Sequence, residues 1–426
     1  LGALGFEKKG AIHRKLFGAA ILEVNFTKKE ITYPEAAGLV INERQTCNFD
    51  ANENFVVLEC VHRLLEKGYK PEHIELEPKW KLGRGASGGR ADILLKDNDG
   101  RPLLIIECKT AGIEFKRAWN KTLQDGDQLF SYAQQISETQ FLCLYTSDLD
   151  AGAVGYTSHI IAHRDNEKYL ADNPLFKSFK SVTDVKERHA VWRDTYKLDY
   201  TTKGIFEENI QPYHIGKDKY SLADLHAISA RDQQKKYHEF ATILRQHNVS
   251  GRENAFDKLV NLFLCKLVDE IENPSDLKFY WKGVAYDTHF DLMDRLQQLY
   301  QAGMGKFLGE DITYINQGDV NNALRFIKQN PDATQRAVWN LFIQQKFFTN
   351  NDFSLIDVHN EKLFYQNAEV LLKILQMWQD IRLTDPHGHN QFLGDMFEGF
   401  LDQGVKQSEG QFFTPMPICR FIMMSL

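Results

Sequence analysis

Cysteine is scarce in this chain of 426 residues, and no two cysteines form a C-x-x-C pair. A zinc ribbon is therefore not expected, because its ligands come in such closely spaced pairs. The wide scatter also argues against a disulfide framework and favours reduced thiols in a cytoplasmic protein. The six positions are Cys47, Cys60, Cys108, Cys143, Cys265 and Cys419.

Long apolar runs are also absent. No segment approaches the ~20 residues that a membrane-spanning helix needs, and no secretory signal is evident at the start. An excess of positive charge is absent too, since the formal net charge is −7. This argues against a passive nucleic-acid coat, although basic residues can still cluster on one face. The chain is 43% hydrophobic and 26% charged, which is typical of a folded globular protein.

A phosphate-binding loop of the form G-x-x-x-x-G-K-[ST] is missing, so no ATP-driven motor is expected in these residues. The nearest stretch, residues 303–306, lacks the leading spacing and the hydroxyl residue. The first residue is Leu1, and the last stretch ends within an apolar helical pattern. We therefore expect the chain to be part of a longer polypeptide.

Two kinds of hydrophobic pattern divide the chain. In the first half a helix is expected at 51–67, with strands at 73–80, 90–96, 102–109 and 140–147 and a helix at 125–137. This alternation indicates an α/β domain.

From about residue 222 helical spacing dominates, at 231–247, 252–272, 288–303, 319–329, 332–346 and 361–381. We expect domains at 1–220 and 221–390 and a final segment at 391–426. The boundary near 220 is soft, because residues 150–220 show no clear periodicity.

One pair of apolar runs flanks the turn residues 97–100, and Asp99-Gly100 is a strong hairpin signal. If these two residues form the loop, the register places Asp92 directly opposite Glu107. A four-residue loop would leave the two acids as diagonal neighbours, and only an odd loop or a bulge would put them on opposite faces. Lys109 follows Glu107 by two residues and so points to the same face.

Two carboxylates on one face of an apolar hairpin would repel each other unless a cation lies between them. Mg²⁺ prefers such oxygen ligands and would polarise a phosphodiester and activate a bound water. Lys109 would orient that water or stabilise the charge of the phosphorane. The main structural alternative is a local salt bridge among Arg90, Asp92 and Lys109, and an E-x-K at a strand end is often only a solvated edge.

Asp92 followed by Glu107-Cys108-Lys109 at the end of an apolar strand resembles the PD-(D/E)XK nuclease motif, with Ala91 in the position of the proline. The stretch 81–110 is similar to the N-terminal nuclease domain of type I restriction endonuclease subunits. The resemblance implies a central mixed sheet flanked by helices at 1–220, and Mg²⁺-dependent hydrolysis of DNA.

The resemblance also supplies further site residues. It places a helical acid near the metal, which indicates Glu59 as a third metal ligand. Glu53 and Glu77 are competing acids. Without the resemblance, Glu59 would be interpreted as a surface residue of a helix. Gln128 and Tyr132 match the Q-x-x-x-Y motif of the same subunits, and residues four apart share one helix face. In the family that face approaches the active site and the nucleic-acid backbone. Taken alone, the two would be an exposed polar pair.

A second resemblance concerns the helical half. Residues 248–263 look like the N-terminal helical domain of N6-adenine DNA methyltransferases of the type I modification-subunit kind. Residues 393–400 through 410–415 resemble the segment that opens the catalytic domain in that family. This likeness places Gln411, Phe412, Thr414 and Pro415 near S-adenosylmethionine. The ordinary alternative is a turn between helices with a buried pair of phenylalanines.

The rest of a methyltransferase is not in the sequence. Its Gly-rich cofactor loop and Asn-Pro-Pro-aromatic motif would follow the opening segment, and the sequence ends at Leu426. Residues 173–176 (Asn-Pro-Leu-Phe) lack the second proline and come too early in the chain. We therefore expect no methylation by this chain alone.

Together the resemblances imply a single-chain restriction–modification enzyme of the type IIG or type I-like kind. This would be a type II-like site-specific deoxyribonuclease for phage defence in the cytoplasm of a bacterium or archaeon. Its partner would be double-stranded DNA, with dimerisation on DNA as a route to double-strand cleavage and no membrane contact. Two alternatives stay open: an inactive nuclease-fold module that binds DNA or acts as a scaffold, and a stand-alone repair-type nuclease.

Overall fold

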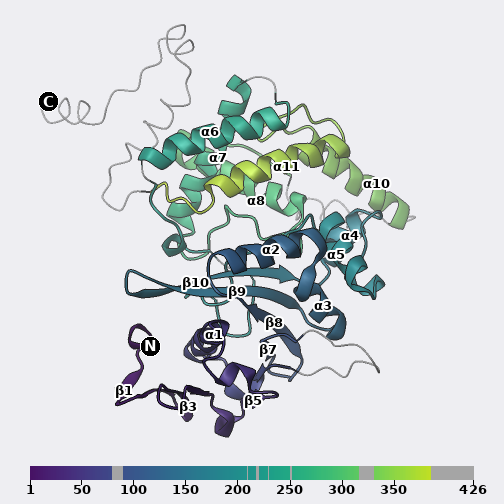
Figure 1. The fold of residues 1–426 in the computed structure, drawn as a ribbon. Coiled ribbons are helices and arrows are strands. Elements are labelled where there is room, and N and C mark those ends of the chain that lie inside the picture. The colour runs from purple at the N-terminus through teal and green to yellow at the C-terminus, as the bar shows by residue number, and fades with distance from the viewer. Residues whose placement is uncertain are drawn as a thin grey trace, which may run out of the picture. The chain divides into compact units, whose positions relative to one another are not determined.

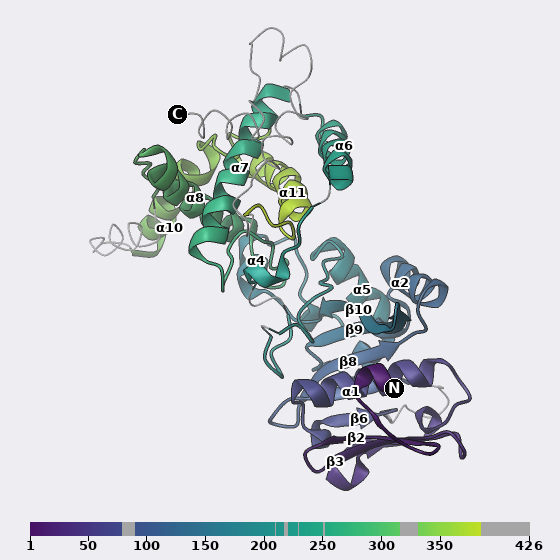
Figure 2. The same cartoon turned by 90° about the vertical axis from the view of Figure 1, so that its left-hand side faces the viewer.

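A computed structural model describes residues 1–78, 90–208, 210–216, 220–228, 230–249, 252–315 and 331–384 (Figures 1 and 2). The chain divides into two compact units, Leu1–Asp218 with Lys282–Tyr286, and Lys219–Trp281 with Asp287–Leu426. This division falls close to the soft boundary at 220, but no sequence pattern indicated that residues 282–286 join the first unit. Among the described helices, none combines the length and the apolar character needed to cross a bilayer.

A six-stranded sheet forms the centre of the first unit, in the order β10-β9-β8-β7-β6-β5. β8 runs parallel to β9 and β5 parallel to β6, whereas the other neighbours are antiparallel. The expected mixed sheet is thus confirmed. Its strands are β5 (Val40–Ile41), β6 (Ile74–Leu76), β7 (Ile93–Lys96), β8 (Pro102–Cys108), β9 (Phe141–Asp150) and β10 (Ala153–Ala162).

Helices cover both faces of this sheet (Figure 1). On one face lies α1 (Glu53–Lys67), and on the other lie α2 (Ile113–Asp125) and α3 (Asp127–Gln135). Alternate residues of β8, namely Leu104, Ile106 and Cys108, share a buried core with α1. Because side chains alternate along a strand, the intervening Glu107 faces the side of α2 and α3. The unit also contains α4 (Glu167–Asp172) and α5 (Val185–Asp194).

A smaller antiparallel sheet, β1-β2-β3-β4, precedes α1. Its buried side chains, among them Leu22, Val24 and Ile31, belong to the same core as α1, and Figure 2 shows the two elements at the same end of the unit. Its strands are β1 (Glu7–Lys9), β2 (Ile12–Phe17), β3 (Ala20–Asn25) and β4 (Glu30–Thr32). Short 3-10 turns occur at Gly2–Leu4, Glu35–Ala37, Gln45–Cys47, Pro71–His73 and Phe179–Ser181.

The described residues of the second unit form helices joined by irregular segments. The helices are α6 (Ala230–Gln246), α7 (Arg252–Glu272), α8 (His289–Gly303), α10 (Pro331–Ile343) and α11 (Glu361–Trp378), with a 3-10 turn at Leu222–Asp224 and π-helical turns at Met304–Leu308 and Gln344–Phe348. Five of the six stretches with helical spacing coincide with them, and the sixth, 319–329, lies outside the described residues. That this unit is of the methyltransferase N-terminal kind stays a prediction.

Candidate functional site

The β7–β8 hairpin places the two acids of the predicted motif opposite each other. Strand pairing joins Ile93 to Ile106 and Leu95 to Leu104, and one step further along the same register Asp92 faces Glu107. The predicted register is therefore right. In this register Ile93, Leu95, Leu104 and Ile106 all face the core that the sheet shares with α1.

The turn that closes this hairpin differs from the predicted one. The amide of Asp97 donates to the carbonyl of Arg101 at 2.8 Å, so the loop has three residues rather than two, and Gly100 adopts a left-handed φ of 77°. An odd loop alone would put the acids on opposite faces. Lys96 pairs with Pro102, however, while Leu95 pairs with Leu104. Leu103 is thus an extra, bulged residue that restores the register.

Asp92 is held at both its backbone and its side chain. Its Oδ2 accepts a hydrogen bond from the amide of Cys108 at 2.7 Å, and its carbonyl accepts one from the amide of Glu77 at 2.9 Å. Burial, followed by the charge of Glu107, raises the pKa of Asp92 well above its usual range. The carboxyl is thus fixed in place and costly to ionise without a cation.

Three carboxylates converge here, from Glu53, Asp92 and Glu107, with oxygens that lie within 4.8 Å of one another. Glu107 is only 4% exposed, and its Oε2 has no hydrogen-bond partner among the described residues. Burial raises the pKa of Glu107 although Lys109 opposes the shift. A buried oxygen without a partner is destabilising unless a ligand satisfies it.

Lys109 bridges two of these acids. Its Nζ donates to Oε1 of Glu107 at 2.6 Å and to Oε1 of Glu53 at 3.0 Å. Burial disfavours the ammonium ion, but Glu107 and Glu53 outweigh burial and hold the pKa of Lys109 above its usual range. Lys109 is therefore a fixed cation at the edge of the cluster.

The alternative salt bridge among Arg90, Asp92 and Lys109 does not form in this arrangement. The Arg90 guanidinium instead contacts the side chains of Glu43 and Gln45, and Lys109 pairs with the other two acids of the cluster.

Glu59, expected as the third metal ligand, is not brought to the cluster. Its carboxylate pairs with Arg63 and accepts a hydrogen bond from the hydroxyl of Tyr145 at 2.7 Å. Glu53, in the first turn of α1, supplies the third carboxylate of the cluster in place of Glu59. The two acids are six positions apart along the helix, which amounts to about 9 Å at 1.5 Å per residue.

Glu77, the other competing acid, has a structural environment. Its carboxylate accepts hydrogen bonds from the amides of Glu43 at 2.9 Å and Thr46 at 2.6 Å. Its backbone has a φ of 51°, a conformation that costs a non-glycine residue energy. Glu77 thus fastens the segment after β5 to Asp92, the residue that precedes β7.

The Q-x-x-x-Y residues lie on α3 and differ in their surroundings. Tyr132 is buried and its hydroxyl donates to the carbonyl of Arg90 at 2.8 Å. Burial and the neighbouring Glu107 raise the pKa of Tyr132 far above its usual range, so the phenol stays a neutral donor. Gln128 is exposed one turn earlier, and within the described residues it forms no hydrogen bond to the three acids.

These residues fit a divalent cation. Hard cations take carboxylate oxygens, and the buried Oε2 of Glu107 lacks a partner that a metal ion would provide. Three ionised acids beside one ammonium group also leave a net charge of about −2, which a divalent ion would balance. Glu53, Asp92 and Glu107 would hold the ion.

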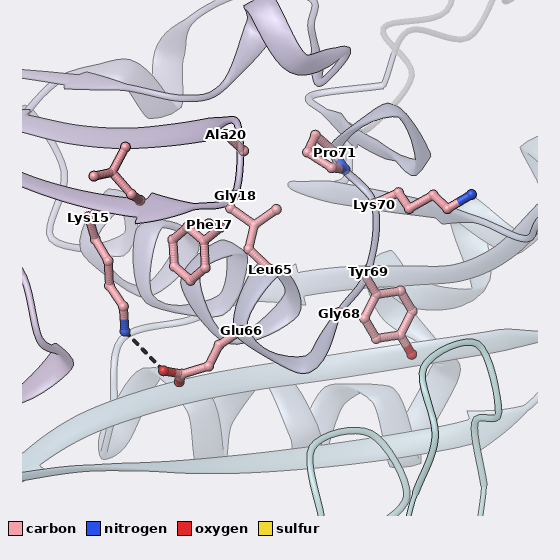
Figure 3. Close-up of a pocket in the computed structure, with 11 residues that line it drawn as sticks. Lys15, Phe17, Gly18, Ala20, Leu65, Glu66, Gly68, Tyr69, Lys70 and Pro71 are labelled. Carbon is pink, nitrogen blue, oxygen red and sulfur yellow. Dashed lines mark hydrogen bonds and ion pairs between the residues drawn. The ribbon is translucent and has the colours of Figure 1, made fainter.

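A hollow elsewhere in the first unit does not contribute to this cluster (Figure 3). It has a volume of about 540 Å³ and lies beside Leu65 and Glu66, near the end of α1, about 20 Å along the helix from Glu53. Lys15 on its wall is paired with Glu66 at 2.9 Å. None of the residues that line the hollow belongs to the carboxylate cluster, so the hollow has no part in holding a metal ion there.

The residues expected near S-adenosylmethionine, Gln411, Phe412, Thr414 and Pro415, lie outside the described residues. So do residues 79–89, which form part of the nuclease resemblance. Their placement stays a prediction.

One family model matches this part of the chain. Residues 52–154 match the family described as "Type I restriction enzyme R protein N terminus (HSDR_N)". The match spans about a quarter of the chain and includes Glu53, Asp92, Glu107, Lys109 and Tyr132. No curated protein matches the chain. The family match supports a restriction-enzyme nuclease module in the N-terminal part of this protein.

Proposed function

We propose that the first unit is a Mg²⁺-dependent DNA endonuclease domain that hydrolyses phosphodiester bonds. The observation that carries this proposal is the convergence of Glu53, Asp92 and Glu107 beside Lys109, with one buried carboxylate oxygen left without a partner. Buried like charges raise pKa values and cost stability, and such arrangements concentrate at functional sites.

The residues of this chain have distinct roles in the proposed reaction. A bound Mg²⁺ would polarise the scissile phosphate and lower the pKa of a water molecule. Lys109 already lies 2.6 Å from Glu107, so its ammonium group can hold the attacking water or stabilise the charge that develops on the phosphate. Tyr132 acts as a positioning residue, because its hydroxyl fixes the carbonyl of Arg90 two residues before Asp92.

The geometry weighs against the alternative of an inactive module. A DNA-binding scaffold gains nothing from three acids that repel each other, and acids at this place would also repel the phosphates of DNA. A metal ion removes both penalties. The complete set of three acids and a lysine is therefore better explained by metal-dependent hydrolysis.

We further propose that this nuclease is the cutting part of a single-chain restriction–modification enzyme, of the type IIG or type I-like kind, acting as a type II-like deoxyribonuclease in the cytoplasm. The match at 52–154 supports the restriction-enzyme part. The methyltransferase part rests on the sequence resemblance at 248–263 and 393–415. In the complete protein it would use S-adenosylmethionine to methylate adenine at N6, a reaction that this chain would not perform alone.

The test is cleavage of unmethylated plasmid DNA of varied sequence by the full-length protein with and without Mg²⁺. Wild type should cut only with the metal. Asp92→Asn should abolish cutting, because one ligand and its charge are removed. Asp99→Asn makes the same chemical change at the exposed tip of the same hairpin and should cut normally. Absence of Mg²⁺-dependent cutting by wild type would refute the proposal.

A further inference from the structure

The exposed face of α2 carries positive charge that the fold does not use. Lys116, Arg117 and Lys121 are exposed, and none forms an ion pair with another described residue. Arg117 and Lys121 are four apart on the helix, so their like charges repel each other. This surface therefore has no evident role in stabilising the unit.

The two acids of α2, Glu114 and Asp125, lie in its first and last turns, and neither forms an ion pair with the three cations. Glu114 accepts a hydrogen bond from the hydroxyl of Thr110, and Asp125 accepts one from the amide of Asp127 at 3.0 Å. Between them the exposed positions other than the three cations are the amides Asn120 and Gln124. The middle of the face is thus cationic in a chain whose net charge is −7.

The opposite side of α2 is firmly packed. Phe115, Trp119 and Thr122 are buried. The centroid of the Trp119 ring lies 4.4 Å from the ring centroid of His159 and 4.6 Å from that of Tyr200. The helix is therefore held at a fixed rotation, and its three cations are displayed on a rigid element.

The position of α2 connects this face to the carboxylate cluster. The helix begins at Ile113, only four residues after Lys109, and the amide of Phe115 donates to the carbonyl of Thr110 at 3.2 Å. α2 also lies on the opposite face of the sheet from α1 (Figure 1), and strand alternation directs Glu107 to that face. The first of the three cations, Lys116, follows Lys109 by only seven residues.

We propose that the face formed by Lys116, Arg117 and Lys121 binds the phosphate backbone of duplex DNA next to the cutting site. This inference rests on the proposed nuclease function. The three side chains span about 7.5 Å along the helix axis, enough to meet two or three phosphates. Lysine and arginine contacts of this kind position a duplex without reading its sequence.

The test compares salt dependence of duplex binding in an Asp92→Asn background with Mg²⁺, so that no DNA is cut. Each phosphate contact contributes about 0.9 to the slope of log K against log salt. The triple variant Lys116→Gln/Arg117→Gln/Lys121→Gln should therefore reduce the magnitude of this negative slope by about 2 to 3. The control, Lys8→Gln/Lys9→Gln/Lys28→Gln, removes the same charge from exposed residues of the β1–β4 region and should leave the slope unchanged.

The outcomes separate this inference from the function on which it rests. An unchanged slope in the α2 variant overturns the inference, and so does an equal fall in both variants, which would be an effect of net charge. If the protein with Asp92 intact cuts DNA in either case, the nuclease proposal stands. A parent chain that neither cuts nor binds duplex DNA overturns both.

Discussion

Glu53 and Glu59 lie on the same helix, yet only Glu53 reaches the acids of the hairpin. The sequence favoured Glu59 through the family resemblance and could not choose by physical reasoning, because both acids suit an amphipathic helix. The choice depends on where α1 starts relative to the end of β8, a tertiary distance. A local signal did exist, since acids are favoured in the first turn of a helix, but it indicates stability as readily as function.

The first prediction contrasts these two acids. Glu53→Gln should weaken Mg²⁺ binding by about 100-fold and reduce cleavage in parallel, because removing even an outer-shell partner of a metal typically costs 10- to 100-fold. Glu59→Gln keeps an acceptor for the hydroxyl of Tyr145 and should leave both quantities near wild type. Metal titration and plasmid cleavage measure the two effects. The reverse pattern would restore Glu59 as the ligand.

The second prediction concerns Asp92 in the absence of metal. Burial and Glu107 raise its pKa, so the folded protein holds this proton more tightly than the unfolded chain. The stability contributed by the protonated form is present at low pH and is lost as pH rises through the raised pKa. Asp92→Asn, which cannot ionise, should therefore raise the Tm of the metal-free protein at neutral pH.

Mg²⁺ should affect the Tm of the two proteins differently. It stabilises a folded state that binds it, so wild type should gain Tm with added Mg²⁺ while Asp92→Asn gains little. Thermal melts with and without the metal measure both effects. A variant that melts below wild type without metal, or that keeps the full Mg²⁺ shift, would contradict this account of the cluster.

At the level of elements, the β7–β8 hairpin shows what sequence patterns determine. A two-residue loop at Asp99-Gly100 predicted the register, and that register is right: Ile93, Leu95, Leu104 and Ile106 all belong to the core beneath the sheet. The turn was predicted wrongly, since Asp-Gly suits two-residue and three-residue loops alike. Only tertiary packing selects the longer loop together with the compensating bulge at Leu103.

Other elements escaped prediction from the sequence for a related reason. β10 is an edge strand whose first half alternates between exposed and partly buried residues, so its pattern is weak. α2 buries only Phe115, Trp119 and Thr122, and its charged face obscures the periodicity. Long helices such as α7 and α11 bury more apolar residues and were predicted within a few residues of their ends. Periodicity is thus most reliable where burial is extensive.

For the whole molecule, buried histidines make stability depend on pH. Burial lowers the pKa of His62, His159, His163 and His289 to about 4 each. Unfolding releases them to their usual value of 6.5, so the unfolded chain binds more protons between these values. Stability should therefore fall as pH drops through this window. The raised pKa values of Asp92 and Glu107 act in the opposite direction, so a single histidine must be isolated by comparison.

His163 offers that comparison. Its Nδ1 lies 3.1 Å from the carbonyl of Thr139 and its Nε2 lies 3.1 Å from Nη1 of Arg188. A carbonyl accepts and a guanidinium donates, so the ring is neutral with its proton on Nδ1. A glutamine can offer the same donor and acceptor but cannot titrate. Between pH 7 and pH 5, His163→Gln should lose about 2 kcal/mol less stability than wild type.

Urea unfolding at the two pH values measures this difference, and only the change with pH matters, because the substitution shifts stability at both. His359→Gln provides a control, because the side chain of His359 is 68% exposed. That variant should lose as much stability on acidification as wild type. An equal loss in wild type and His163→Gln would mean that His163 accepts a proton in the folded protein, which the guanidinium of Arg188 opposes.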